Sequence, residues 1–306
     1  MSSPIDAAVH GDKAYFRVYR SRRIYLYNLT HGGWSKLVKC LVKDSSLVML
    51  PVAYKGGVRF LLHTVGGIKR TKDQQGPDDE YTDDIYQFSD PACRQWTRSI
   101  SYPKLKTKRS QVTVVFSDGC LIIAGGSSAH GPVNTVHVLI VTCQDKVWRE
   151  VACLPYKVFR ASGSVCNGML YILGGYVSPF DPIRSACVAT VSKLVESNSN
   201  DQGIFSTIKD LELSDSACVS FRNSILAIGG WKKLGSALTD QPKGTKLVHV
   251  YDTSRNIWKE LKGQLSEPRC FAFAAAFEDK QKIMIVGGYD RPNGTCTNSV
   301  EFSIIN

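Results

Sequence analysis

Residues able to recognise another molecule recur at matching places in this sequence. Arginines stand just before short apolar runs, and large aromatic residues directly follow pairs of glycines. These residues are Arg109, Arg160 and Arg269, and Tyr176, Trp231 and Tyr289. A guanidinium group can hold a carboxylate through two parallel hydrogen bonds, and arginine and large aromatics dominate the energetics of protein interfaces. The pattern therefore predicts a surface that binds an acidic protein or peptide.

Each arginine also has a plainer interpretation. It can pair with a neighbouring carboxylate, such as Glu267 or Asp290, and only fix a loop. For the set as a whole we expect a ligand-facing role, to which Lys69 and Arg70 would add positive charge. These two residues begin a long loop that ends in the acidic run Asp78–Asp84. The loop would either fold as a flap held by its opposite charges or stay solvated and mobile.

Residues for metal or acid–base chemistry do not cluster in the sequence. Of the six histidines, only His130 falls in a loop that follows a glycine pair. The ten cysteines include no Cys-x-x-Cys pair and no zinc-site spacing with histidine. Cys166, Cys218 and Cys270 lie in corresponding apolar segments and are expected to be reduced packing residues. We therefore expect no catalytic residue, no metal and no cofactor, and a reducing, cytoplasmic compartment.

Five glycine pairs mark the elements that must position these residues, and each pair closes a short apolar run. The pairs are Gly66-Gly67, Gly125-Gly126, Gly174-Gly175, Gly229-Gly230 and Gly287-Gly288. They recur about every 50 to 60 residues, which is typical of the blades of a β-propeller. No helical pattern follows any pair, so we expect the glycines to permit positive φ and close strand approach rather than to bind phosphate.

Each repeat is predicted to contain four short strands, with a tight turn such as Asn167-Gly168 between the first two. A tryptophan marks the fourth strand in four repeats, at Trp34, Trp96, Trp148 and Trp258. Together with the glycine pairs, these features resemble the kelch repeat family. The resemblance implies one all-β domain, residues 1–306, folded as a six-bladed propeller of four-stranded antiparallel blades. The expected blades are residues 1–42, 43–104, 105–156, 157–212, 213–264 and 265–306. The tryptophans are expected to pack between neighbouring sheets.

Two repeats depart from the family pattern. In the first, Val18-Tyr19 stand where the glycines should be. In the fourth, no tryptophan is present and Phe205 is expected in its place. The third strand of that repeat is expected at Ala186–Lys193.

Closure of the propeller is the open question in the sequence. The sixth repeat ends with the strand Ser299–Ile304 and has no fourth strand, while Ile5–Val9 is expected to be the first strand of the first blade. Either the last blade has three strands, or Met1–Val9 completes it, or the chain is cut from a longer protein.

The resemblance also implies a function. Kelch propellers bind partners on the loops that surround the central channel, and many are substrate receptors of cullin-type ubiquitin ligases. We expect a non-catalytic protein-interaction module of this kind. Such receptors normally carry BTB and BACK domains, which this sequence lacks, so the role would require a longer parent protein or a separate partner. The alternatives are an actin-binding cytoskeletal protein and a sugar-active enzyme similar to a sialic acid epimerase. The iron motif of plant specifier proteins is incomplete, since Phe88 follows Glu80 and Asp84 where that motif has histidine.

The composition of the chain further restricts the classes of partner that we expect. The formal net charge of +11 favours acidic partners, but basic residues are dispersed and no nucleic-acid-binding motif is present. No apolar run approaches the roughly 20 residues that span a bilayer, and the first residues do not resemble a signal peptide. We expect a soluble monomer, not secreted if this is the natural start, that binds neither nucleic acid nor membrane.

Overall fold

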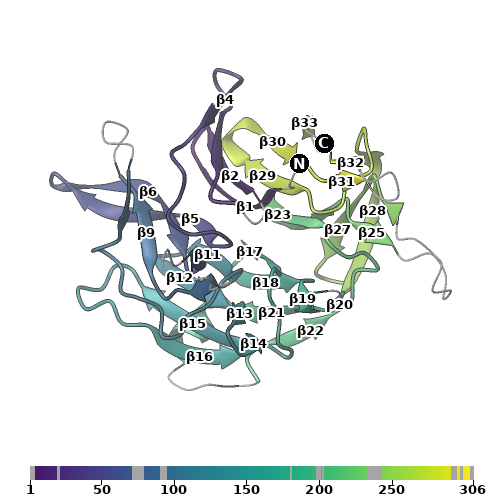
Figure 1. The fold of residues 1–306 in the computed structure, drawn as a ribbon. Helices are drawn as coiled ribbons and strands as arrows, with labels where there is room; N and C mark the ends of the chain where they lie inside the picture. Colours follow the sequence, from purple (N-terminus) through teal and green to yellow (C-terminus); the bar gives the residue numbers. More distant parts are fainter. Residues whose placement is uncertain are drawn as a thin grey trace.

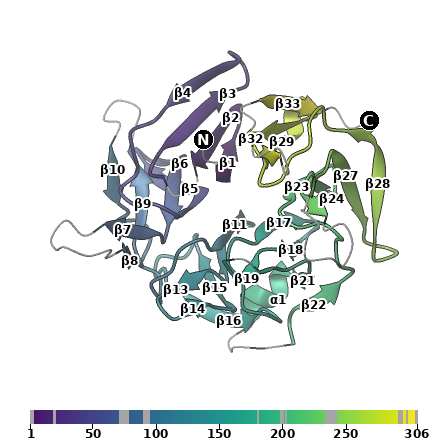
Figure 2. The same cartoon turned by 45° about the vertical axis from the view of Figure 1, so that its right-hand side comes forward.

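Six antiparallel sheets surround a central axis, and the first and last sheets lie side by side (Figures 1 and 2). The computed structural model describes residues 4–18, 21–70, 79–89, 95–179, 181–197, 201, 203–232, 243–290, 295–296 and 299–303. This arrangement confirms the predicted all-β, six-bladed propeller. Five sheets have four strands, and the sixth has three among the described residues.

The blades are numbered in chain order. Blade 1 contains β1 (Pro4–His10), β2 (Lys13–Val18), β3 (Ile24–Asn28) and β4 (Gly33–Lys36). Blade 2 contains β5 (Ser46–Tyr54), β6 (Gly57–Val65), β9 (Ile85–Phe88) and β10 (Trp96–Arg98). Blade 3 contains β11 (Thr113–Ser117), β12 (Cys120–Ala124), β15 (Thr135–Ile140) and β16 (Arg149–Cys153).

Blade 4 contains β17 (Ser162–Cys166), β18 (Met169–Leu173), β21 (Ala186–Thr190) and β22 (Ser206–Ile208). Blade 5 contains β23 (Ala217–Phe221), β24 (Ser224–Ile228), β27 (Leu247–Asp252) and β28 (Ile257–Gln264). Blade 6 contains β29 (Phe273–Phe277), β30 (Lys282–Val286) and β33 (Val300–Ser303).

Five short hairpins follow the glycine pairs. They are β7 (Ile68–Arg70) with β8 (Asp79–Tyr81), β13 (Ser127–Ser128) with β14 (Gly131–Pro132), β19 (Tyr176–Ser178) with β20 (Asp181–Pro182), β25 (Trp231–Lys232) with β26 (Lys243–Gly244), and β31 (Tyr289–Asp290) with β32 (Thr295–Cys296). Each hairpin is the loop between the second and third strands of its blade, so these loops have a defined backbone at their bases.

The N-terminal segment forms β1 and pairs with β2, as expected for the first strand of blade 1. One expected strand is too long: β21 ends at Thr190, and α1 (Val191–Glu196) replaces the rest. Val191 and Leu194 are three residues apart and both are buried, so a helical turn places them on one face against blades 3 and 4. A short 3-10 turn, η1 (Glu278–Lys280), joins β29 to β30.

The core lies between neighbouring sheets. Trp96 and Trp148 are 6 % and 3 % exposed, as expected, and Phe205 packs in the core of blades 3 and 4. The expectation is wrong for Trp34, which is 44 % exposed. The indoles of Trp96 and Trp148 each donate to a carbonyl just after the fourth strand of the preceding blade. For Trp34 that segment would belong to blade 6, whose fourth strand is not among the described residues.

The glycine pairs have the structural role expected of them. Gly125 has φ +61°, and a Cβ atom there would lie 2.4 Å from the carbonyl oxygen of Val158 in the next blade. The same carbonyl accepts a hydrogen bond from the Gly126 nitrogen at 2.8 Å. The pair therefore allows two blades to meet closely while linking them through the backbone.

Candidate binding site at the channel mouth

The segment that enters each of blades 2 to 6 bonds to the residue that follows the glycine pair of that blade. Two backbone hydrogen bonds of 2.8–3.1 Å join each pair of residues. The pairs are Lys43 and Ile68, Ser110 and Ser127, Phe159 and Tyr176, Ser214 and Trp231, and Cys270 and Tyr289. Consequently the loops between blades and the loops after second strands meet on one face, and the predicted aromatic residues lie at this junction.

The next residue in each segment forms a ring that sequence reasoning missed. We call these five residues the mouth ring; they are Asp44, Gln111, Arg160, Asp215 and Phe271. All have positive φ, between 52° and 58°, although none is glycine. Left-handed backbone is uncommon for such residues and most of all for bulky ones, and strain of this kind often marks a functional site.

Backbone hydrogen bonds connect members of the mouth ring. The Gln111 nitrogen donates to the Asp44 carbonyl at 2.9 Å, and the Arg160 nitrogen donates to the Gln111 carbonyl at 3.0 Å. On the other side, the Phe271 nitrogen donates to the Asp215 carbonyl at 3.0 Å. These three bonds use backbone atoms only, so the side chains of the mouth ring can vary without loss of the bonds.

Arg160 lies between two aromatic side chains of this face. Its guanidinium carbon is 5.1 Å from the ring centre of Tyr176 and 5.5 Å from that of Phe271. These are cation–π distances, and the side chain is half-buried. The two rings thus hold the guanidinium in place while leaving part of it accessible to a ligand.

Asp215 orients the two aromatic residues that flank the arginine side of the mouth. One of its carboxylate oxygens accepts hydrogen bonds from the Tyr176 hydroxyl and the Trp231 indole, both at 2.6 Å. Tyr176 is buried and Trp231 is half-buried. The structure therefore brings together three of the predicted binding residues, Arg160, Tyr176 and Trp231, through a carboxylate that was not predicted.

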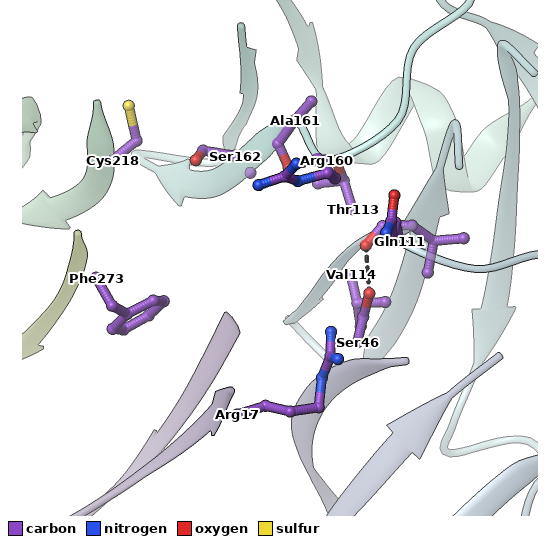
Figure 3. Close-up of a pocket in the computed structure, with 12 residues that line it drawn as sticks. Arg17, Ser46, Gln111, Thr113, Val114, Arg160, Ala161, Ser162, Cys218 and Phe273 are labelled. Carbon is purple, nitrogen blue, oxygen red and sulfur yellow. Dashed lines mark hydrogen bonds between the residues drawn. The ribbon is translucent and has the colours of Figure 1, made fainter. Parts of the chain in front are cut away.

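A cavity of about 140 Å³ continues from Gln111 and Arg160 into the channel. The first strands of blades 2 to 6 line it, together with Arg17 of β2 (Figure 3). Arg17 is 1 % exposed, and its guanidinium is 3.8 Å from the Asp44 carboxylate. The described residues that line the cavity include both arginines and no aspartate or glutamate. The lining therefore offers the positive charge of Arg160, whereas the Asp44 carboxylate offsets part of the charge of Arg17.

Arg109 and Arg269 do not fit the ligand-facing role predicted for them. They are 1 % and 0 % exposed, and each guanidinium donates to the carbonyl of the first glycine in its own blade, Gly125 or Gly287, at 3.0 Å. Arg269 also bonds to Ser299. The physical reason is position: these arginines stand two residues before the mouth ring, where the side chain turns into the blade.

The remaining predicted residues lie around the mouth. Tyr289 is half-buried and holds the entry segment of blade 6. Lys69 donates to the buried Asp84 carboxylate at 2.5 Å, so much of its charge is already compensated. The side chain of Arg70 and the loop 71–78, expected to be a flap or mobile, lie outside the described residues.

Asp84 is a buried carboxylate, whose side chain is 0 % exposed. Burial alone would raise its pKa, but hydrogen bonds from Lys69 and Tyr86 outweigh burial, and the pKa is lowered. Arg98 and Lys104 add ion pairs at 2.9 Å and 3.4 Å. This arrangement anchors the base of the β7–β8 hairpin.

Two histidines, His63 and His137, are buried inside the blades, as are most of the described cysteine side chains. Burial lowers the pKa of His63 to about 4 and that of His137 to about 3. Within the described part of the chain, no three His, Cys, Asp or Glu side chains gather as a metal site, and none of the described cysteine side chains is in a disulfide. The same residues contain no helix long and apolar enough to cross a membrane.

Comparisons with known proteins agree with this architecture. A family model for the kelch motif matches residues 108–155. Kelch repeat and BTB domain-containing protein 1 of horsepox virus is 23 % identical over 244 residues, and Kelch-like protein 36 of Bos taurus is 24 % identical over 253 residues. These matches cover 78 % and 82 % of this chain but only 37 % of each relative.

A solved structure, that of YjhT, superposes over the whole chain with a TM-score of 0.72. It is 11 % identical, and the match covers 98 % of that chain, so it supports the fold alone. The chain is thus a six-bladed β-propeller with a kelch motif at residues 108–155, and it is similar to kelch repeat proteins.

Proposed function

We propose that this propeller is a non-catalytic recognition module that binds an acidic segment of another protein at the channel mouth. The observation that carries the proposal is the position of Arg160, held between Tyr176 and Phe271 at the entrance of a cavity. The described residues that line this cavity include no aspartate or glutamate. A carboxylate of the partner would bond to the exposed part of this guanidinium.

The surrounding aromatics support a protein segment as the ligand. Trp231 and Tyr289 are half-buried at the same junction, so each offers apolar surface together with a polar group. The net charge of +11 would speed the approach of an acidic partner. The chain itself would be monomeric and would bind no nucleic acid.

The relatives suggest a biological setting for this module. The name of the horsepox virus relative combines kelch repeats with a BTB domain, and the chain matches only 37 % of the length of each relative. We propose that the propeller selects substrates for a cullin-type ubiquitin ligase, either within a longer protein or through a separate adaptor. The described cysteine side chains, none of which is in a disulfide, suit the reducing cytoplasm.

Affinity capture followed by mass spectrometry tests the binding face. The test variant combines Arg160→Ala with Trp231→Ala. The matched control is Arg59→Ala, which removes an arginine stacked on Tyr54, 4.2 Å from its ring centre, beside the β5–β6 turn at the other end of blade 2. We expect the control to retain the partners of the unmodified chain and the test variant to lose them. Equal recovery by both variants would show that the mouth is not the binding face.

The proposal that the chain is non-catalytic needs a separate test. The chain would be incubated with sialic acids and with hexoses, and the sugars followed by NMR. We expect spectra identical to those of sugars without protein. Faster interconversion of anomers or epimers, lost in Arg160→Ala, would replace the recognition role with an enzymatic one.

A further inference from the structure

The β5–β6 hairpin extends beyond the third strand of blade 2 (Figure 1). In blade 3 all five residues of β12 pair with the third strand, β15. In blade 2 only the last three residues of the nine-residue β6 pair with β9, and the other six pair with β5 alone among the described strands. At about 3.3 Å per residue, six residues span roughly 20 Å. We call the outer part of this hairpin, residues 51–60, the blade 2 tip.

The backbone and the direction of the tip are both defined. The turn residues Lys55-Gly56 have φ of +44° and +79°, positive at both positions as in a type I′ turn. The Phe60 ring stacks on His10 of blade 1, with ring centres 4.7 Å apart. It also meets the Phe116 ring of blade 3 edge-on at 6.2 Å. Contacts with both neighbouring blades therefore fix the base of the tip.

Strand register gathers apolar side chains on one face of the tip. Ala53 lies opposite Val58, and Pro51 lies opposite Phe60. Residues directly opposite each other in antiparallel strands point to the same face. Val58 is 71 % exposed and Phe60 is 36 % exposed. The apolar face of the tip is therefore open to solvent, although its base is anchored.

Positive charge surrounds the tyrosine of the tip. The Tyr54 ring is 41 % exposed, and its centre is 4.2 Å from the Arg59 guanidinium carbon and 5.4 Å from the Lys55 ammonium nitrogen. Residues 46–65 contain no aspartate or glutamate. The hairpin thus combines exposed apolar surface, an amphipathic ring and two cations, with no acidic residue of its own.

The adjoining turns are of mixed charge. In the β1–β2 turn, the Asp12 carboxylate accepts a hydrogen bond from Thr30, and Lys13 is exposed. In the β11–β12 turn, Asp118 is exposed. Positive charge without acidic residues is therefore a property of the projecting hairpin and not of the turns beside it.

Size and charge decide between the possible occupants of the tip. A stable protein interface takes about 20–30 residues from each side, whereas the tip consists of residues 51–60. A second copy of the chain is disfavoured because each copy has a net charge of +11. A lipid surface needs no complementary groove, and anionic headgroups attract cations while apolar side chains enter the boundary of the acyl chains.

We propose that the blade 2 tip docks on the surface of an anionic lipid bilayer. Ala53 and Val58 would enter the headgroup region, Tyr54 would lie at its boundary, and Lys55 and Arg59 would contact lipid phosphates. The tip and the channel mouth lie at opposite ends of β6, so a docked propeller keeps its mouth available to a partner. The expectation that the chain binds no membrane rested on the lack of a spanning run, which a docked tip does not require.

Vesicle sedimentation tests the proposal with the full chain. The probes are vesicles of phosphatidylcholine alone and vesicles that also contain phosphatidylserine. The test variant is Val58→Asp. The matched control is Ile100→Asp, which makes the same change of charge at an aliphatic side chain that is 96 % exposed and lies after β10, at the mouth end of blade 2. We expect Ile100→Asp to bind the phosphatidylserine vesicles as the unmodified chain does, and Val58→Asp to bind them at least tenfold more weakly.

The cations of the tip give a second comparison. Replacing Lys55 and Arg59 together by glutamine should weaken binding to the phosphatidylserine vesicles by about 10- to 30-fold. The same double variant should lose the preference for these vesicles over phosphatidylcholine alone. Retention of the full preference would contradict docking through these two side chains.

Insertion is measured separately by fluorescence. Tryptophan is placed at the tip in Val58→Trp and at the control position in Ile100→Trp, and the five native tryptophans of the unmodified chain give the baseline. Phosphatidylserine vesicles with brominated acyl chains should quench the added fluorescence of Val58→Trp only. Equal quenching of the two variants, or quenching of neither, would overturn the proposal.

The remaining outcomes separate this inference from the proposed function. Arg160→Ala should bind the vesicles as the unmodified chain does, because the tip does not use the mouth. Equal binding of Val58→Asp and Ile100→Asp to the phosphatidylserine vesicles would overturn docking through the tip. Loss of a captured protein by Val58→Asp, together with no vesicle binding by the unmodified chain, would assign the tip to a protein partner and would also overturn it.

Discussion

Replacement of Gly125 by alanine tests whether the glycine pairs connect the blades. A Cβ atom at this position would lie 2.4 Å from the Val158 carbonyl oxygen, with φ at +61°. The matched control is Gly168→Ala in the β17–β18 turn, where φ is +71° and no atom lies within 4 Å of the added Cβ. Both variants carry the cost of left-handed backbone, and only the first adds a clash.

The expected magnitudes follow from these two contributions. Left-handed backbone costs an alanine about 1 kcal/mol relative to glycine, which is the full loss expected for Gly168→Ala. In Gly125→Ala the Val158 backbone must also move, although its carbonyl accepts the Gly126 hydrogen bond. Loss of a buried backbone hydrogen bond adds about 1–3 kcal/mol, and the clash adds strain. We expect a total of about 3–5 kcal/mol, among the largest effects of point mutations.

Urea unfolding followed by circular dichroism measures both variants. The account predicts a lower midpoint for both, with Gly125→Ala losing at least twice the free energy of unfolding that Gly168→Ala loses. Equal losses would show that close approach of the blades at the glycine pair contributes nothing, and that φ alone selects glycine there.

Three further predictions concern buried polar groups. Arg109→Lys should lower the free energy of unfolding by about 2 kcal/mol, because lysine cannot make both of the guanidinium hydrogen bonds to Gly125 and Thr135. The affinity for the partner should stay within twofold. A large loss of affinity in a stably folded variant would restore a ligand-facing role for Arg109. Burial lowers the pKa of His63 to about 4, so the unfolded chain binds the additional proton between pH 6.5 and 4, and stability falls as pH decreases through this window by up to about 1.4 kcal/mol per unit. His63→Gln should flatten that decrease in urea midpoints, and an unchanged slope would contradict the assignment. Asp84→Asn should lower the free energy of unfolding by about 2–3 kcal/mol at pH 7. Because the Asp84 pKa is lowered in the folded chain, this difference in stability from the unmodified chain should shrink as pH falls below about 4. Thermal melts at pH 7 and below pH 4 check this, and a difference in stability that does not change with pH would refute it.

The architecture was predictable from sequence because repetition amplifies a weak local signal. A single glycine pair is uninformative, but five in register with tryptophans identify blades. The sequence did not predict that the residues after the third strand of blade 4 form the helix α1, since Val191 and Leu194 fit a strand or a helix equally well by composition.

The binding site was only partly predictable. Arg109, Arg160 and Arg269 all precede a first strand, yet one is two positions further along the entry segment than the others. That offset decides whether the guanidinium enters the blade or faces the channel. The mouth ring has no shared residue type, and only its backbone conformation reveals it. A residue-by-residue alignment of the segments that enter the blades would have been needed to predict which arginine faces the channel.

Trp34 shows how a repeat can mislead. Its sequence context matches that of Trp96 and Trp148, but Trp34 is 44 % exposed and the described residues include no fourth strand of blade 6 beside it. Local sequence predicts where a side chain points. Whether that side chain is buried depends on the neighbouring blade, which the local sequence does not describe.

The most direct test of the recognition site is calorimetric titration of a captured partner segment into the unmodified chain, Arg160→Ala and Arg59→Ala. Alanine retains a Cβ atom, so the backbone cost of positive φ at position 160 stays the same. Loss of a charge-assisted hydrogen-bonded pair worth about 1.5–3 kcal/mol predicts affinity about 10- to 100-fold weaker for Arg160→Ala, with Arg59→Ala unchanged. Equal dissociation constants for all three proteins would contradict recognition of an acidic partner at the mouth.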